Sequence, residues 1–156
     1  GDVTNIIQLA HIASHQGMVA ADNITGKSHK MDYSAVPSAI FTMPEIGTVG
    51  VSERQAKADE LDVIISKFPF IANGKAIAMG ESDGFVKLIA DETTKVILGG
   101  SVVGPHATDL MAIIGNLIST KTTIEMAKNV IYAHPTTAES IHEAILMLEG
   151  KGIHFA

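Results

Sequence analysis

The chain has 156 residues, of which 46% are hydrophobic and 18% charged, a composition typical of a single soluble globular domain. Its 11 lysines and arginines against 17 aspartates and glutamates give a net charge of −6, which argues against the basic face that nucleic acid or an anionic membrane requires. The apolar runs are only a few residues long and no signal-peptide pattern opens the chain, so a soluble protein without a membrane span is expected. Cysteine is absent, which excludes disulfides, thiolate metal sites and thiol redox chemistry within these residues.

The first expected element is a helical region over residues 5–25, either one long helix or two short ones. Its apolar residues keep three- and four-residue spacings except across Gln16-Gly17. Thr4 is suited to cap its start and Gly26 to end it.

Two histidines of this region, His11 and His15, have the four-residue separation that metal ligands on a helix use. No cysteine and no third helical ligand accompanies them. Packed or solvated histidines are therefore the favoured interpretation, and no metal site is predicted.

A polar segment then separates this region from the rest of the chain. Residues 27–37 are polar at first and then extended, because Pro37 disfavours helix in the residue before it. We expect a linker here, with a boundary near residue 30 that divides the chain into residues 1–30 and 31–156.

Five β-rich runs follow. A turn with proline and glycine at residues 43–47 separates the first two runs. The pair Ser52 and Gln55 then predicts a capped helix that extends to about Glu60. The last two runs are expected to form a hairpin. Three turn dipeptides occupy residues 73–84, and their spacing leaves the conformation of that stretch open. The five runs are residues 39–42, 48–51, 62–70, 84–90 and 96–103.

Three helices are expected after the last strand. Apolar side chains spread around much of the helix over residues 108–120, so its second face is expected at a subunit interface or another domain, with a central core helix as the alternative. Thr122 and Glu125 predict a short helix, and the apolar spacing over residues 141–148 predicts another that Gly150 ends. Strands in hairpin order followed by helices predict an α+β fold, a mainly antiparallel sheet of about five strands covered by helices on one face.

The candidate catalytic residues lie where this last helix starts. Pro135 disfavours helix at His134, which therefore lies in the connection before the helix. In one interpretation Thr136 and Glu139 form a capping box and nothing more. In the other, Glu139 binds one ring nitrogen of His134 and orients the imidazole, leaving the second nitrogen to face outward and exchange protons with a substrate. The spacing leaves both open, but the second predicts a Glu139 oxygen within about 2.6–3.2 Å of a His134 nitrogen.

The sequence around His134 resembles the C-terminal signature of the pyridine nucleotide-disulfide oxidoreductases. The match comprises His-Pro-Thr-x-x-Glu followed by His142-Glu143-Ala144, and further blocks lie upstream in the family's order and roughly its spacing. Gly1-Asp2-Val3 with Leu9-Ala10-His11 is similar to the family's last flavin-contacting motif, so the resemblance covers nearly the whole chain. The upstream blocks are residues 40–45, 49–53, 84–88 and 98–105.

The resemblance implies that residues 31–156 are the family's dimerisation domain and residues 1–30 the terminal helix of its FAD-binding domain. The family's glycine-rich flavin fingerprint, redox-active cysteine pair and nicotinamide domain have no counterpart here. We therefore expect a fragment that is colourless and inactive alone, with FAD and NAD bound by the full-length enzyme. Asp2 would hydrogen-bond the ribityl chain, and Leu9, Ala10 and His11 would also contact the flavin. The amino terminus of the helix would face the flavin pyrimidine edge, where the helix dipole favours negative charge.

The resemblance also implies a role for the candidate pair. Family members form a homodimer through this domain, and His134, oriented by Glu139, would take the proton from a dihydrolipoyl thiol that attacks the disulfide of the other subunit. It further implies a cis His134–Pro135 peptide. The partners would be dihydrolipoyl groups of 2-oxoacid dehydrogenase or glycine cleavage complexes, in the cytoplasm or the mitochondrial matrix. The glutathione- and mercury-reducing branches of the family, and a stand-alone non-catalytic dimerisation module, are the alternatives.

Overall fold

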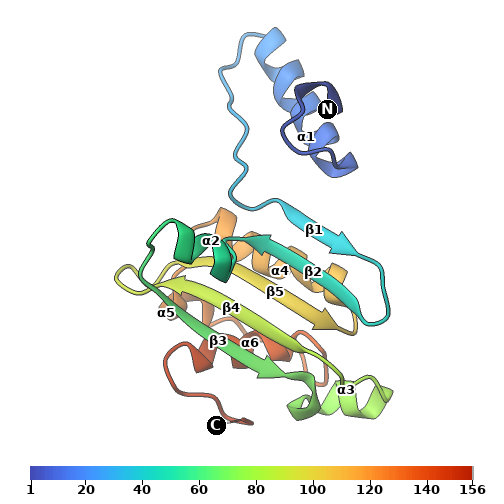
Figure 1. The fold of residues 1–156 in the computed structure, drawn as a ribbon, viewed down its shortest axis with the longest axis vertical. Helices are drawn as coiled ribbons and strands as arrows, with labels where there is room; N and C mark the ends of the chain where they lie inside the picture. Colours follow the sequence, from blue (N-terminus) through green and yellow to red (C-terminus); the bar gives the residue numbers. More distant parts are fainter. Residues whose placement is uncertain (156) are drawn as a thin grey trace.

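A computed structural model of the chain describes residues 1–155 and confirms an α+β fold built on one five-stranded antiparallel sheet with helices (Figure 1). Helices follow the sheet in the chain, as the order of the sequence patterns predicts. The elements are η1 (Asp2–Thr4), α1 (Ala10–Ile24), β1 (Pro37–Ile40), β2 (Glu45–Gly50), α2 (Glu53–Ala58), β3 (Val63–Pro69), η2 (Phe70–Ala72), α3 (Gly74–Met79), β4 (Phe85–Asp91), β5 (Ile97–Gly104), α4 (Ala107–Ser119), α5 (Ile124–Ala127) and α6 (Glu139–Met147).

The sheet has the strand order β1-β2-β5-β4-β3, and every neighbouring pair is antiparallel. The β4–β5 hairpin is therefore at its centre, with β2 and β3 on either side. Gly99 of β5 packs so closely on the chain after β2 that an added Cβ would lie 2.0 Å from the Val51 carbonyl oxygen. Glycine at this position permits the close approach of the two backbones.

One face of the sheet is covered by α4 and α6, and the core lies between them and the strands (Figure 1). Helix α4 packs on β2 and β5, whereas α6 packs on β3 and β4. The buried residues of α4 form a single stripe toward the sheet, so within residues 1–155 the helix is not buried on more than one side. That its outer face meets another subunit or domain stays a prediction. The stripe comprises Ala107, Leu110, Met111, Ile114, Leu117 and Ile118.

The start of the first helix differs from the prediction. Asp2–Thr4 form a 3-10 turn that ends with Asn5 in the left-handed region (φ 52°), and α1 begins only at Ala10. The Thr4 hydroxyl donates to the Gly1 carbonyl at 2.9 Å instead of capping a helix. The helix is then continuous to Ile24, and Gly26 follows it with φ 94°, the positive value expected of a glycine after a helix.

The predictions for the first two strands were displaced by two or three residues. β1 spans Pro37–Ile40 rather than residues 39–42, and β2 starts at Glu45 within the predicted turn. The turn is shorter than predicted because all of β2 pairs with β5. The pairing runs from Glu45 opposite Gly104 to Gly50 opposite Gly99. Pairing to a central strand therefore decides where β2 begins, rather than the turn residues themselves.

One further helix cap is confirmed and one needs correction. Ser52 caps α2 as predicted, its Oγ accepting from the Gln55 amide at 3.1 Å, although the helix ends at Ala58 instead of near Glu60. Thr123, rather than Thr122, caps α5, because the Thr122 hydroxyl instead contacts the hydroxyl of Thr120. The stretch left open at residues 73–84 contains α3, capped by Asn73.

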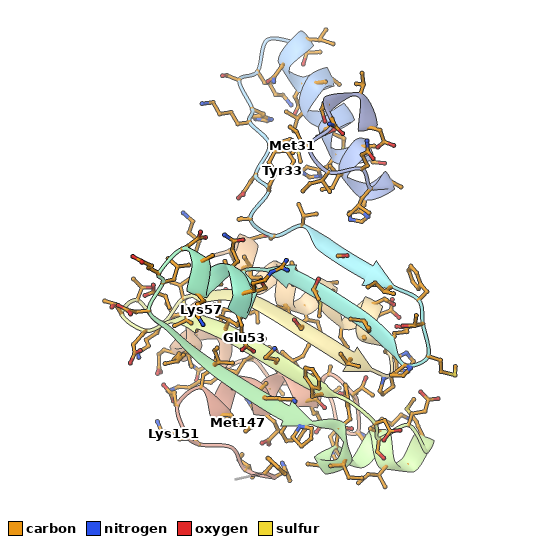
Figure 2. All side chains as sticks on the ribbon, in the orientation of Figure 1. Met31, Tyr33, Glu53, Lys57, Met147 and Lys151 are labelled. Atoms are coloured by element: carbon orange, nitrogen blue, oxygen red, sulfur yellow. The ribbon has the colours of Figure 1, made fainter. Side chains whose placement is uncertain are left out.

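Helix α1 lies apart from the sheet at the end of an extended connection (Figure 1). Figure 2 shows Met31 and Tyr33 of this connection beside α1, and the Gln16 side chain donates to the Tyr33 hydroxyl at 2.9 Å. A ring nitrogen of His11 lies 2.9 Å from the Pro37 carbonyl oxygen. Residues 1–155 contain no group of three or more histidine, cysteine or acidic side chains that could hold a metal ion. The domain boundary near residue 30 stays a prediction.

No helix of residues 1–155 has both the length and the apolar character that crossing a membrane requires.

Candidate active site

His134 and Glu139 meet at the start of α6. The His134 Nδ1 atom lies 2.8 Å from Glu139 Oε1, within the predicted distance range. The peptide between His134 and Pro135 is cis, as the family resemblance implies. His134 has a largely exposed side chain, and its Nε2 makes no hydrogen bond within residues 1–155. The pair therefore presents a free ring nitrogen on an imidazole whose other nitrogen is held by a carboxylate.

The carboxylate of Glu139 also serves the helix start. Its Oε2 accepts from the Thr136 amide at 2.7 Å, which is one half of a capping box. The other half does not form, since the Thr136 hydroxyl donates to the Ala133 carbonyl at 2.7 Å and the residue at the N-cap position is Ala138. Glu139 thus holds the turn with one oxygen and contacts the histidine with the other, so it does more than cap the helix. A catalytic role for the pair stays a prediction.

The ionisation of Glu139 follows from these contacts. Partial burial by itself raises the pKa of this carboxyl, but the Thr136 amide and the His134 ring outweigh it and lower the pKa below the ordinary glutamate value. At neutral pH Glu139 is therefore an anion that accepts hydrogen bonds only. An anionic acceptor at Nδ1 favours the neutral tautomer that carries its hydrogen there and leaves the Nε2 lone pair free.

The segment before His134 packs on α6 through a second contact. Tyr132 stacks on His142, with ring centroids 5.2 Å apart and planes 21° apart. His142 Nε2 also lies 3.2 Å from the Lys128 carbonyl oxygen. Burial raises the pKa of the Tyr132 hydroxyl, which keeps it neutral. The sequence pattern gave no role to this pair, because aromatic stacking of residues ten apart depends on the tertiary fold.

A third contact comes from a residue that is distant in the sequence. Asn73, just before α3, is buried, and its Nδ2 donates to the Thr136 carbonyl oxygen at 3.0 Å. Its Oδ1 accepts from the Ala76 amide at 2.9 Å and so caps α3. Sequence reasoning treated Asn73-Gly74 only as a turn dipeptide. An asparagine before a helical segment is also a capping signal, which would have located α3 but not the contact to Thr136.

A second histidine–glutamate pair lies one turn further along α6. Glu143 is only 5% exposed, and it accepts from the amides of Ile153 (3.0 Å) and His154 (3.3 Å) and contacts His154 Nδ1 at 2.7 Å. Burial by itself raises the pKa of Glu143, but these contacts to the C-terminal segment outweigh it and lower the pKa. Phe155 then packs edge-to-face on Phe68 with centroids 6.5 Å apart. Glu143 therefore holds the C-terminal segment beside the candidate site through hydrogen bonds.

Both pairs line one cavity of about 520 Å³. A cavity of this size is in the range of small-molecule sites. Its walls combine the two histidines and two carboxylates with apolar and amide side chains. They include His134, Glu139, Glu143, His154, Asn73, Phe68, Tyr132 and Ile131.

The residues predicted to contact a flavin lie elsewhere, at the other end of the chain. Asp2 is in η1, Leu9 precedes α1, and Ala10 and His11 are in its first turn. Leu9 is half-buried and the other three are exposed. No side chain caps the start of α1 and no acidic residue lies in its first turn. Their role in flavin binding stays a prediction.

Comparison with known proteins connects this geometry to a family. Residues 36–145 match the model of the pyridine nucleotide-disulphide oxidoreductase dimerisation domain. The chain is 48% identical over 154 residues to a dihydrolipoyl dehydrogenase of Chlamydia trachomatis and 46% identical over 156 residues to one of Bacillus subtilis. Each alignment covers 99% of this chain and 33% of the relative, so the chain spans about a third of the length of these curated relatives.

Solved structures of two related proteins have the same fold. LpdA from Mycobacterium tuberculosis superposes with a TM-score of 0.90 at 30% identity, covering 95% of this chain and 32% of that one. The flavoprotein disulfide reductase RclA from Escherichia coli gives a TM-score of 0.86 at 25% identity, covering 93% and 34%. The match of residues 36–145, the high identity to the relatives and the shared fold together place this chain in the pyridine nucleotide-disulphide oxidoreductase family, as its dimerisation domain.

Proposed function

We propose that this chain provides the dimerisation domain and the acid/base pair of a dihydrolipoyl dehydrogenase that acts on dihydrolipoyl groups of 2-oxoacid dehydrogenase or glycine cleavage complexes. The observation that carries the proposal is the 2.8 Å contact between His134 Nδ1 and Glu139 Oε1, which leaves Nε2 free at a cavity. The relatives named dihydrolipoyl dehydrogenase support the substrate class.

The geometry suits proton transfer from a thiol. A thiol of ordinary pKa is mostly protonated at neutral pH, and only the thiolate attacks a disulfide well. His134 Nε2 would take that proton, while Glu139 at Nδ1 keeps the ring oriented and stabilises the imidazolium that forms. The Thr136 amide holds the second carboxylate oxygen, so Glu139 cannot rotate away without losing a hydrogen bond.

The remaining chemistry requires groups outside these residues. When bound by the full-length protein, FAD and NAD supply the two-electron oxidation for which residues 1–155 have no group of their own. The uncapped start of α1, without an acidic residue in its first turn, fits the electron-rich edge of a flavin. On this proposal Asp2, Leu9, Ala10 and His11 contact FAD, residues 1–30 belong to the FAD-binding domain, and the enzyme is cytoplasmic or, in a eukaryote, mitochondrial.

A chimera tests the proposed activity. This chain would replace the matching third of the Bacillus subtilis dihydrolipoyl dehydrogenase, to which it is 46% identical. We expect the chimera to bind FAD and to reduce NAD with dihydrolipoamide at a rate within about tenfold of the parent, a difference of about 1.4 kcal/mol in activation free energy. A folded, FAD-containing chimera that transfers electrons from NADH to an artificial acceptor but does not oxidise dihydrolipoamide would contradict the substrate assignment.

The same proposal predicts a homodimer. We expect the chain to dimerise at micromolar concentration and to bury about 1,600 Å² or more in total, the size of a standard specific interface. Sedimentation equilibrium over that range measures the mass directly. The chain has a mass of 16.4 kDa, so a single species of that mass at every concentration would count against the dimer.

A further inference from the structure

The segment that carries His134 lacks the hydrogen bonds that usually fix a backbone. Among the described residues, no backbone–backbone hydrogen bond involves Ile131 to Pro135. The preceding contact is from the Val130 amide to the Ala127 carbonyl, and the next is from the Ser140 amide to the Thr137 carbonyl. The described hydrogen bonds of this segment are instead made with side chains, those of Glu139 and Thr136.

Asn73 makes the one described hydrogen bond that reaches Thr136, the residue after Pro135, from outside residues 124–147. It is 4% exposed, and its position 63 residues before Thr136 makes the contact between them a tertiary one. The orientation of its amide follows from its partners, because the Ala76 amide requires an acceptor and the Thr136 carbonyl requires a donor. Both ends of the side chain are thus used.

The contact with Thr136 connects Asn73 to the acid/base pair through a short series of hydrogen bonds. Asn73 Nδ2 binds the Thr136 carbonyl, and the amide of the same residue binds Glu139 Oε2. The other oxygen of that carboxylate binds His134 Nδ1. Moving Thr136 would therefore change the direction from which Glu139 is held and, with it, the orientation of the imidazole.

We propose that Asn73 is a positioning residue for the His134–Glu139 pair, holding the Thr136 peptide so that one carboxylate oxygen stays on the turn and the other on the histidine. The inference rests on the proposed function for its consequence in catalysis, but its structural part does not. The competing account is that Asn73 only caps α3. The two accounts differ in which atom of the side chain matters: the donor Nδ2 in the first and the acceptor Oδ1 in the second.

Two substitutions distinguish the role of the donor Nδ2 from that of the acceptor Oδ1. Asn73→Asp and Asn73→Ser both retain an oxygen suited to an N-cap, because aspartate and serine are preferred there as strongly as asparagine. Neither can donate to Thr136 as Asn73 does, since an ionised aspartate has no donor and serine is shorter. Ser52→Ala is the matched control, because it removes the side-chain cap of α2, which makes no contact in this series. Thermal unfolding of each variant shows how much stability the change costs.

The decisive measurement is the tautomer of His134, from nitrogen-15 NMR of histidine side chains in this 156-residue chain. At about pH 8, above the usual titration range of histidine, the original chain and Ser52→Ala are expected to show mainly the Nδ1–H form. Asn73→Asp and Asn73→Ser are expected to lose that excess while remaining folded. If one of them fails to fold, the other decides the question. Retention of the original tautomer ratio in a folded Asn73 variant would overturn the proposal.

The consequence for catalysis is measured in the chimera. We expect Asn73→Ser to lower kcat for dihydrolipoamide by on the order of 10-fold to 100-fold, the scale of an ångström-sized misplacement, with the KM for NAD unchanged. Ser52→Ala should leave both constants unchanged. If substitution of His134 itself does not affect dihydrolipoamide oxidation, the proposed function fails, and the NMR result still decides whether Asn73 positions the pair. An unchanged kcat in Asn73→Ser, with His134 essential, would overturn the positioning role.

Discussion

Replacing His134 with alanine is expected to lower kcat/KM for dihydrolipoamide by about 10²-fold to 10⁴-fold in the chimera, the usual contribution of a general base. The reason is that Nε2 is the free ring nitrogen at the cavity, and without it the substrate thiol must lose its proton to water. Steady-state kinetics with dihydrolipoamide and NAD measures the loss. Electron transfer from NADH to an artificial acceptor needs no thiol deprotonation and should be unaffected, which makes it the control within the same protein.

Glu139→Gln tests the second member of the pair. A carboxylate accepts with both oxygens, whereas an amide has one oxygen acceptor and a nitrogen that only donates. Glutamine can therefore accept from the Thr136 amide or from His134 Nδ1, but not from both. We expect kcat/KM to fall by more than about tenfold, though less than for His134→Ala. Turnover equal to that of the unsubstituted chimera would mean that Glu139 serves only the start of the helix.

Ile141→Ala is expected to reduce the free energy of unfolding by about 2–5 kcal/mol, the range for removing a large aliphatic side chain from a core. Ile141 is 0% exposed and lies in α6 between the two glutamates that line the cavity. Removing its side chain leaves a void beneath the helix that positions Glu139. Chemical denaturation followed by circular dichroism measures the difference.

The control for this substitution is Ile131→Ala. Ile131 is 96% exposed, so the same change there should alter the free energy of unfolding by no more than about 0.5 kcal/mol. Equal losses at the two positions would show that α6 does not pack on the sheet as described. A loss confined to Ile141 would show that the core holds α6, the helix that carries Glu139.

The sequence was sufficient for the elements whose signals are local. The spacing of Ile141, Ala144, Ile145 and Leu148 predicted α6, and all four are buried. The contact between His134 and Glu139 could also be predicted from the sequence. A proline, a helix start and a separation of five residues restrict where the two side chains can lie. The choice between a cap and a pair could not be made from spacing, since both use the same carboxylate.

The contacts that pattern reasoning missed depend on residues far apart in the chain. Asn73 and Thr136 are separated by 63 positions, and Glu143 contacts His154 of the C-terminal segment, 11 residues further along. Neither contact has a local signal. The start of β2 was misplaced for a similar reason, because its pairing with β5 extends the strand into residues that read locally as a turn.

Glu139 and Glu143 are four residues apart on α6, one holding the segment with His134 and the other the C-terminal segment. An α-helix turns by about 100° for each residue, so side chains four positions apart point in nearly the same direction. Inserting or deleting one residue between them would swing one glutamate away from the cavity while the other stayed. The number of residues between the two glutamates therefore matters to the site as much as the glutamates themselves.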